Sequence, residues 1–160
     1  MLRVGTVGTS SIMRTIQEAI RLTDGMECRV VYSRTGEQGR AFAAEMGVPE
    51  HCTDYAAMLE RSDLDLIDIA SPNRFHAEQA LAALEHGKHV IVEKPAAVTR
   101  GDVQRLIDAA RANGVYFFEA ITTLFMPQYE ACRLLLPKLG RIEQAHITYA
   151  QYSSRYVAYL

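Results

Sequence analysis

The residues best placed to do chemistry form the tripeptide Glu93-Lys94-Pro95, which follows an apolar stretch ending at Val92. A lysine at the end of a buried strand can direct its ammonium group at a carbonyl or alkoxide oxygen. It would stabilise negative charge on that oxygen and exchange a proton with it. The alternative is a solvent-exposed Glu-Lys pair, which contributes almost nothing to stability. The tripeptide alone does not decide between these interpretations.

A second candidate site lies near the N-terminus, where residues 4–13 read V-G-T-V-G-T-S-S-I-M. An apolar strand runs into a turn at Gly8, and a helix begins directly after it. The free N–H groups and the dipole of such a helix favour a pyrophosphate, which would lie against the amides beginning at Thr9. Aligned on Gly8, the pattern G-x-G-x-x-G has Ser10 and Met13 at its other glycine positions. The turn by itself is therefore a weak indication of a dinucleotide site.

The strand predicted over residues 27–33 ends in Ser33-Arg34-Thr35. An NAD site is expected to have a carboxylate at about this position, where it binds the ribose 2′-hydroxyl. The sequence has none there. A hydroxyl followed by a guanidinium suits a 2′-phosphate, so the sequence favours NADP over NAD. The alternative is a solvated arginine in a surface loop.

Ser71-Pro72-Asn73 follows the strand predicted over residues 64–70. Ligands of open α/β sheets lie at the carboxyl ends of the strands, so a dinucleotide would cross this loop. Ser71 or Asn73 can also cap the following helix, and the two roles are compatible. His76 has no obvious proton-transfer partner nearby in the sequence, which favours a structural role for it.

Alternating strand-like and helix-like stretches must position these loops. Predicted strands cover residues 2–7, 27–33, 64–70, 89–92 and 115–118. Predicted helices begin near Ile12 and cover residues 37–46, 54–59, 73–86 and 99–112, with Gly47, Asp54 and Thr99 as expected caps. Strands separated by helices indicate βαβ units. We therefore expect an α/β fold with a doubly wound parallel sheet and helices on both faces.

The pattern changes near the C-terminus. Residues 127–136 can form a helix, and Ile142–Tyr152 is a long β-prone stretch with few residues after it. An unpaired apolar strand exposes backbone groups and tends to aggregate. We expect residues 1–120 to bind the cofactor and residues 121–160 to begin a second, truncated α/β domain. The chain would then be the front part of a longer protein, or its last strand would pair with another chain.

Composition excludes several classes of function. The chain has 160 residues, and its net charge of -2 gives no electrostatic reason to expect nucleic acid or membrane partners. Cys28, Cys52 and Cys132 fit free thiols in a reducing compartment, and no signal-peptide pattern precedes the first strand, so a cytoplasmic location is expected. No cluster of histidine, cysteine and carboxylate residues has the spacing of a metal site.

Taken in order, the motifs V-G-T-V-G-T-S-S-I-M, Y-S-R-T, A-S-P-N-R-F-H, H-G-K-H-V-I-V-E-K-P and F-F-E-A resemble the glucose–fructose oxidoreductase / inositol dehydrogenase (Gfo/Idh/MocA) family. The resemblance covers about residues 2–155. It implies a Rossmann domain that binds NAD or NADP, followed by a larger domain with the substrate pocket and often the oligomer interface. The implied activity is hydride transfer to or from a sugar, polyol or related carbonyl compound, in a homo-oligomer. The alternatives are a dinucleotide-binding sensor or scaffold without chemistry, and an α/β domain that binds no dinucleotide.

The resemblance also implies roles for individual residues. Those matched to the pyrophosphate turn are Gly8, Ser10, Ser11 and Ile12, and those matched to the 2′-phosphate are Ser33 and Arg34. Those matched to the loop beside the nicotinamide half are Ser71, Asn73 and His76, while Glu93 and Lys94 match the family's E-K-P pair. Glu119 matches the family's acidic residue after the sixth strand and, with the others, is expected to bind the cofactor. Lys94 corresponds to the catalytic lysine of the family. The second catalytic group of the family, usually a histidine or aspartate of the second domain, has no counterpart here.

Overall fold

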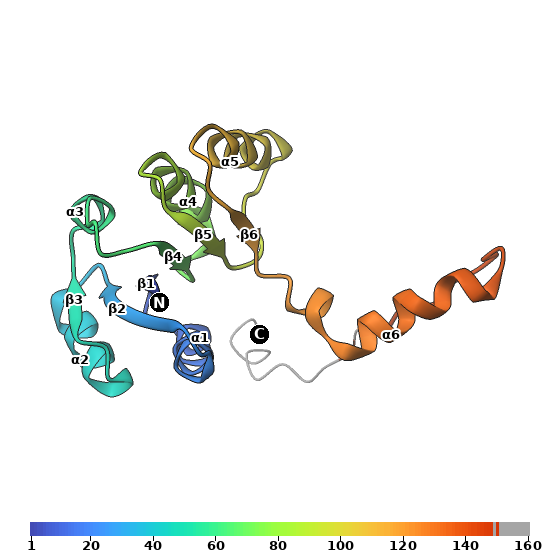
Figure 1. The fold of residues 1–160 in the computed structure, drawn as a ribbon, viewed down its shortest axis with the longest axis horizontal. Coiled ribbons are helices and arrows are strands. Elements are labelled where there is room, and N and C mark those ends of the chain that lie inside the picture. Colours follow the sequence, from blue (N-terminus) through green and yellow to red (C-terminus); the bar gives the residue numbers. More distant parts are fainter. Residues whose placement is uncertain (149, 151–160) are drawn as a thin grey trace, which may run out of the picture. The chain divides into compact units, whose positions relative to one another are not determined.

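The computed structural model describes residues 1–148 and 150, and within residues 1–121 it contains a parallel sheet of six strands (Figure 1). Its strands are β1 (Leu2–Val7), β2 (Met26–Tyr32), β3 (Glu50–Cys52), β4 (Leu66–Ile69), β5 (His89–Val92) and β6 (Phe117–Glu119). They lie in the order β3-β2-β1-β4-β5-β6, and every pair of neighbours is parallel. This order reverses direction between β1 and β4, which is where a doubly wound sheet opens a crevice for a ligand.

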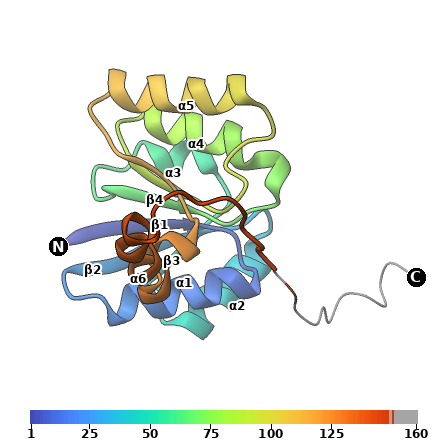
Figure 2. The ribbon, with the colours of Figure 1, turned by 90° about the vertical axis from the view of Figure 1, so that its right-hand side faces the viewer.

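Helices cover both faces of the sheet. They include α1 (Ser11–Leu22), α2 (Gly36–Met46), α3 (Tyr55–Leu59), α4 (His76–Glu85) and α5 (Arg100–Ala112). The described residues also form α6 (Pro127–Leu135) and short 3-10 helices at Asn73–Phe75, Thr122–Phe125 and Leu136–Leu139. Figure 2 shows α1 and α2 on one face of the sheet and α4 and α5 on the other. The predicted doubly wound α/β fold is therefore confirmed.

Apolar side chains of the central strands explain why the sheet is stable between two helical layers. Val7, Ile67 and Ile69 are fully buried and pack with residues of α3, α4 and α5. On the opposite face, Met13 of α1 and Val31 of β2 belong to a second cluster that includes α2. Leu2, Val4 and Val7 in β1, and Leu66, Ile67 and Ile69 in β4, are the apolar residues that made these strands recognisable in the sequence.

The helix caps predicted at Asp54, Thr99 and Gly47 are confirmed. The Asp54 carboxylate accepts a hydrogen bond of 3.0 Å from the Ala57 N–H at the start of α3. The Thr99 hydroxyl accepts one of 3.1 Å from the Asp102 N–H at the start of α5. Gly47 ends α2 with a φ of 70°, in the left-handed region. These caps fix where each helix begins or ends.

Three predictions about individual elements need correction. The sequence did not predict β3, a strand of three residues that forms by pairing with residues 30–32 of β2. The helix expected over residues 73–86 begins instead with a 3-10 turn, and the α-helix starts at His76. The last strand of the sheet covers Phe117–Glu119 rather than residues 115–118, because Val90 to Val92 pair with those three residues.

A strand was predicted over Ile142–Tyr152, and the described residues of this segment do not form one. Residues 142–148 and 150 form no strand, while residues 149, 151 and 152 lie outside the described residues. High β-propensity produces a strand only where a partner offers backbone hydrogen bonds, so propensity alone over-predicted this element.

The chain divides into two compact units, Met1–Ile121 and Thr122–Leu160. The first contains the whole sheet, and the second contains α6 and two of the 3-10 helices. In the described residues, no helix is both long and apolar enough to cross a membrane. The three cysteines are free thiols, as expected.

Candidate functional site

Three loops that carry sequence-predicted site residues begin at the same edge of the sheet. Val7 of β1 is in register with Ile69 of β4, and Ile69 is in register with Val92 of β5. Because all three strands are parallel, the loops that begin at Gly8, Ala70 and Glu93 leave the sheet side by side. The strand order also reverses between the neighbouring strands β1 and β4.

Gly8 is required by its backbone conformation and by its surroundings. Its φ is +115°, and a Cβ at this position would lie 2.8 Å from the backbone oxygen of Ala70. Its N–H donates a hydrogen bond of 3.0 Å to the Tyr32 carbonyl. The turn after β1 is therefore held between β2 and β4, with no room for a side chain.

Helix α1 begins with free donors directly after this turn. Ser10 is its N-cap, but the serine side chain makes no capping hydrogen bond. The first N–H groups of a helix have no intrahelical partner, so those of Ser11 and Ile12 can bind an anion. Both residues are exposed, while Met13 is fully buried and packs α1 against the sheet. Residues 10–12 therefore offer the arrangement predicted for a diphosphate.

Ser33 and Arg34, the two residues predicted to bind a 2′-phosphate, differ in their exposure to solvent. Ser33 is only 5% exposed, and its hydroxyl accepts a long hydrogen bond of 3.5 Å from the Thr35 N–H. Arg34 is exposed, and its guanidinium carbon lies 5.9 Å from the centroid of the Phe75 ring. The guanidinium is thus the group of this pair that can reach a ligand.

Neither Ser71 nor Asn73 in the loop after β4 caps the following helix. The Ser71 hydroxyl donates a hydrogen bond of 2.6 Å to the Gln79 side-chain oxygen. The residues at the N-cap positions of the 3-10 turn and of α4 are Pro72 and Phe75, and neither makes a side-chain capping bond. The interpretation of Ser71 or Asn73 as a helix cap is therefore wrong. Asn73 is exposed at this edge.

His76 joins the loop after β4 to the loop after β5. Its side chain is 1% exposed, with Nδ1 2.9 Å from the Pro95 carbonyl oxygen and Nε2 2.7 Å from the Ser71 carbonyl oxygen. Both ring nitrogens face backbone carbonyl oxygens, and a neutral imidazole can donate its single N–H to only one of them at a time. The imidazole fixes the position of the loop that carries Lys94.

Glu119 holds the same loop from the other side. Its Oε1 accepts a hydrogen bond of 2.8 Å from the Ala96 N–H. Lys94 is exposed between Glu93 and Ala96, which are both buried, and the Lys94–Pro95 peptide bond is cis. The lysine therefore extends from a loop whose backbone is fixed at two points, by His76 and by Glu119.

Asp68 is a buried carboxyl group that the sequence analysis did not single out. It lies in β4 opposite Thr6, is 6% exposed, and has an Oδ1 without a hydrogen-bond partner among the described residues. Burial, and to a smaller extent the nearby Glu93 carboxylate, raise the pKa of Asp68 from 3.8 to about 7. The available signal was an acidic residue inside the apolar run L-D-L-I-D-I-A.

Replacement of Asp68 by asparagine is expected to remove a pH-dependent loss of stability. Because the pKa is raised in the folded chain, the wild type loses stability as the pH rises from about 4 to about 7, where this group is deprotonated. The Asp68→Asn variant lacks this loss. The difference in unfolding free energy between variant and wild type should grow by about 1–3 kcal/mol between about pH 4 and pH 8.

Urea unfolding of the chain at the two pH values measures this difference. The exposed Asp24 provides the matched control, because Asp24→Asn removes a carboxylate that is already solvated. A difference that stays constant with pH for Asp68→Asn would contradict the raised pKa.

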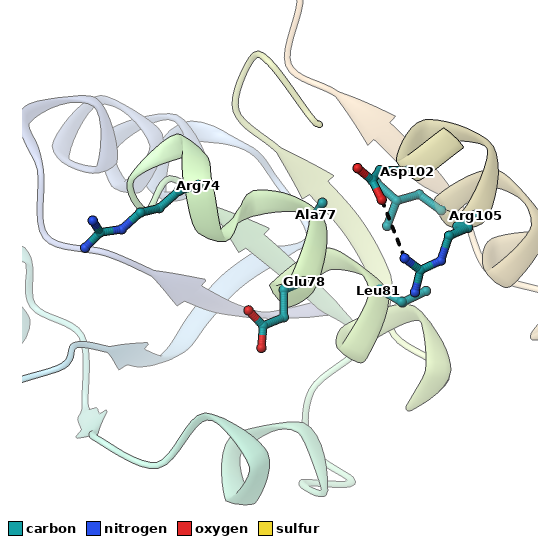
Figure 3. A pocket seen from close by; sticks show the side chains of 7 residues that line it. Arg74, Ala77, Glu78, Leu81, Asp102 and Arg105 are labelled. Atoms are coloured by element: carbon teal, nitrogen blue, oxygen red, sulfur yellow. Dashed lines mark hydrogen bonds and ion pairs between the residues drawn. The ribbon is translucent and has the colours of Figure 1, made fainter. Parts of the chain in front are cut away.

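A groove is lined by side chains of α4 and α5 and by Arg74 of the preceding 3-10 turn (Figure 3). It is lined by Arg74, Ala77, Glu78, Leu81, Asp102, Arg105 and Leu106. Arg105 pairs with Asp102 within α5, at 3.5 Å. Figure 3 shows the Arg74 side chain directed away from that pair.

Sequence comparison places this chain among oxidoreductases. The family model GFO_IDH_MocA, described as an oxidoreductase family with an NAD-binding Rossmann fold, matches residues 2–121. The chain is 36% identical over 159 residues to a scyllo-inositol 2-dehydrogenase (NADP(+)), IolU, of Bacillus subtilis, covering 99% of this chain and 48% of that protein. It is 39% identical to the uncharacterized oxidoreductase YgjR of Escherichia coli, covering 100% and 49%. The chain thus spans about half the length of these relatives.

Solved structures show the same fold. KijD10, a 3-ketoreductase from Actinomadura kijaniata in complex with NADP and TDP-benzene, matches 86% of this chain and 42% of its own, with a TM-score of 0.80 and 31% identity. A biliverdin reductase from Synechocystis in complex with biliverdin and NADP+ matches 88% and 44%, with a TM-score of 0.76 and 29% identity. The chain therefore belongs to the GFO_IDH_MocA oxidoreductase family, and residues 2–121 are its NAD-binding Rossmann fold.

Proposed function

We propose that this chain is the coenzyme-binding part of an NADP-preferring oxidoreductase. The observation that carries the proposal is the cradle formed by Gly8 and the N-terminus of α1. A Cβ at Gly8 would meet the Ala70 carbonyl oxygen at 2.8 Å, and the Ser10 side chain leaves the helix donors free. These features fit the diphosphate of a dinucleotide, whose negative charge the helix dipole favours.

Lys94 is proposed to act on the oxygen of the substrate. A bound nicotinamide dinucleotide supplies or accepts the hydride. The Lys94 ammonium would donate a hydrogen bond to the reacting oxygen, stabilise its negative charge and hold the proton that this oxygen gains or loses. His76 and Glu119 would keep the lysine in place through the Pro95 carbonyl and the Ala96 N–H.

Sugars, polyols and related carbonyl compounds are the proposed substrates of the whole protein. The relatives that support this class include the scyllo-inositol dehydrogenase described above and a 1,5-anhydro-D-fructose reductase of Ensifer adhaerens, which is 39% identical over 116 residues. A substrate pocket and a second catalytic group would come from outside residues 2–121. The homo-oligomeric state also belongs to this proposal for the whole protein.

The preference for NADP rests on Arg34. This exposed guanidinium follows β2, where an NAD site would place a carboxylate, and it can form charge-assisted hydrogen bonds with a 2′-phosphate. Fluorescence titration of the chain should show tighter binding of NADPH than of NADH. The Arg34→Ala variant should bind NADPH about 10-fold more weakly, with little change for NADH.

Arg111→Ala is the matched control, because Arg111 is an exposed arginine in the last turn of α5. It should leave both dissociation constants unchanged. Equal affinities of the wild type for the two coenzymes would contradict the NADP preference, and failure to bind either one would contradict the proposed function itself.

A further inference from the structure

Two arginines from different loops share one aromatic ring at the ligand edge of the sheet. Arg34 follows β2 and Arg74 follows β4, so they lie on either side of the turn after β1 in the sheet order. The guanidinium carbon of Arg34 lies 5.9 Å from the centroid of the Phe75 ring, and that of Arg74 lies 4.6 Å from it. Both guanidinium groups therefore contact the same ring, and they come from the loops after β2 and β4, the two strands that flank β1.

Neither of these cations is neutralised within the described part of the chain. Most arginines there pair with carboxylates, as Arg14 does with Glu45 at 2.7 Å, whereas Arg34 and Arg74 have no ion pair in residues 1–148 and 150. Two guanidinium groups beside one ring repel each other. In a chain with a net charge of -2, this local excess of positive charge favours an anion.

The direction of Arg74 supports the same conclusion. The arginine lines the groove between α4 and α5, whose lining also contains the carboxylates of Glu78 and Asp102. Its side chain is nevertheless directed away from the Asp102–Arg105 pair (Figure 3). Arg74 lies instead against Phe75, on the ring that Arg34 also contacts.

We propose that Arg74 is a second guanidinium for the 2′-phosphate of NADP, acting together with Arg34. The inference rests on the proposed function and adds a residue that determines coenzyme specificity. A phosphate monoester has three terminal oxygens, and planar guanidinium groups bind such oxygens in pairs. The Phe75 ring positions both arginines through cation–π contacts, which reduces the loss of side-chain freedom when the phosphate binds.

The test compares NADPH with NADH, which share every group except the 2′-phosphate. The Arg74→Ala variant should bind NADPH about 10-fold more weakly and NADH with unchanged affinity. If both arginines contact one phosphate, their effects on NADPH affinity are coupled. The fold-loss of NADPH affinity in the Arg34→Ala/Arg74→Ala double variant should then be smaller than the product of the fold-losses in the two single variants. A Phe75→Leu variant, which keeps an apolar side chain but removes the ring, should weaken NADPH binding alone.

Arg105→Ala is the matched control, since Arg105 lines the same groove but pairs with Asp102. It should change neither dissociation constant. An Arg74→Ala variant with unchanged NADPH affinity would overturn the inference while leaving the proposed function intact. Equal weakening of NADPH and NADH would also overturn it, because the contact would then be to the diphosphate. A wild type that binds neither coenzyme would overturn both.

Discussion

Replacement of Lys94 by alanine is expected to lower the kcat of the intact protein by about 100- to 10,000-fold. The ammonium group would be lost from a loop whose backbone stays fixed by His76 and Glu119. Because the proposed adenosine and diphosphate contacts are made by other residues, the dissociation constant for NADPH should change by less than about threefold. Steady-state kinetics over a panel of sugars and polyols, together with NADPH titration, separates the two effects.

Lys138→Ala is the control for a generic loss of positive charge, because Lys138 is exposed in the last 3-10 helix. It should leave kcat unchanged. Full turnover in the Lys94→Ala variant would refute the role given to this lysine. An intact wild type that binds NADPH but reduces or oxidises no compound of the panel would support the alternative of a binding module without chemistry.

Replacement of Gly8 by alanine is expected to damage both the fold and the coenzyme site. The variant would place a Cβ 2.8 Å from the Ala70 carbonyl oxygen at a φ of +115°. We expect a loss of about 2–4 kcal/mol in unfolding free energy. Since the turn must move to relieve the contact, NADPH binding should weaken about 10-fold or more. Urea unfolding and NADPH titration of the chain measure these two effects.

Gly25→Ala separates backbone strain from the contact at the cradle. Gly25 also has a positive φ, of +83°, but an added Cβ would meet nothing within 4 Å. It precedes β2 and therefore lies at the amino ends of the strands, whereas Gly8 lies at their carboxyl ends. This variant should lose about 1 kcal/mol of stability and keep its NADPH affinity. If the Gly8→Ala variant bound NADPH as tightly as the wild type does, the cradle would not be the site that holds the coenzyme.

The fold was predictable because its central strands and helix caps are locally encoded. Apolar runs identified β1, β4 and β5, and the cap residues Asp54 and Thr99 identified the starts of two helices. The short strand β3 was not predictable, because it exists only through pairing with β2. For the same reason, the β-prone residues 142–148 form no strand in the described chain.

The site was predictable where it depends on the ends of strands and not where it depends on tertiary contacts. The sequence indicated Gly8 and Lys94 because each follows an apolar strand. It could not show that His76 and Glu119 hold the same loop, since these contacts join residues 19 and 23 positions apart. Nor could it show that Arg74 lies on the ring near Arg34, since each arginine looks like a solvated surface residue on its own.

The most direct test of this account is a crystal structure of the intact protein with NADP+ bound. We predict a diphosphate within hydrogen-bond distance of the N–H groups at the start of α1, with the nicotinamide ring beside the amine of Lys94. A dinucleotide bound elsewhere, or a Lys94 side chain directed away from the nicotinamide, would contradict the account.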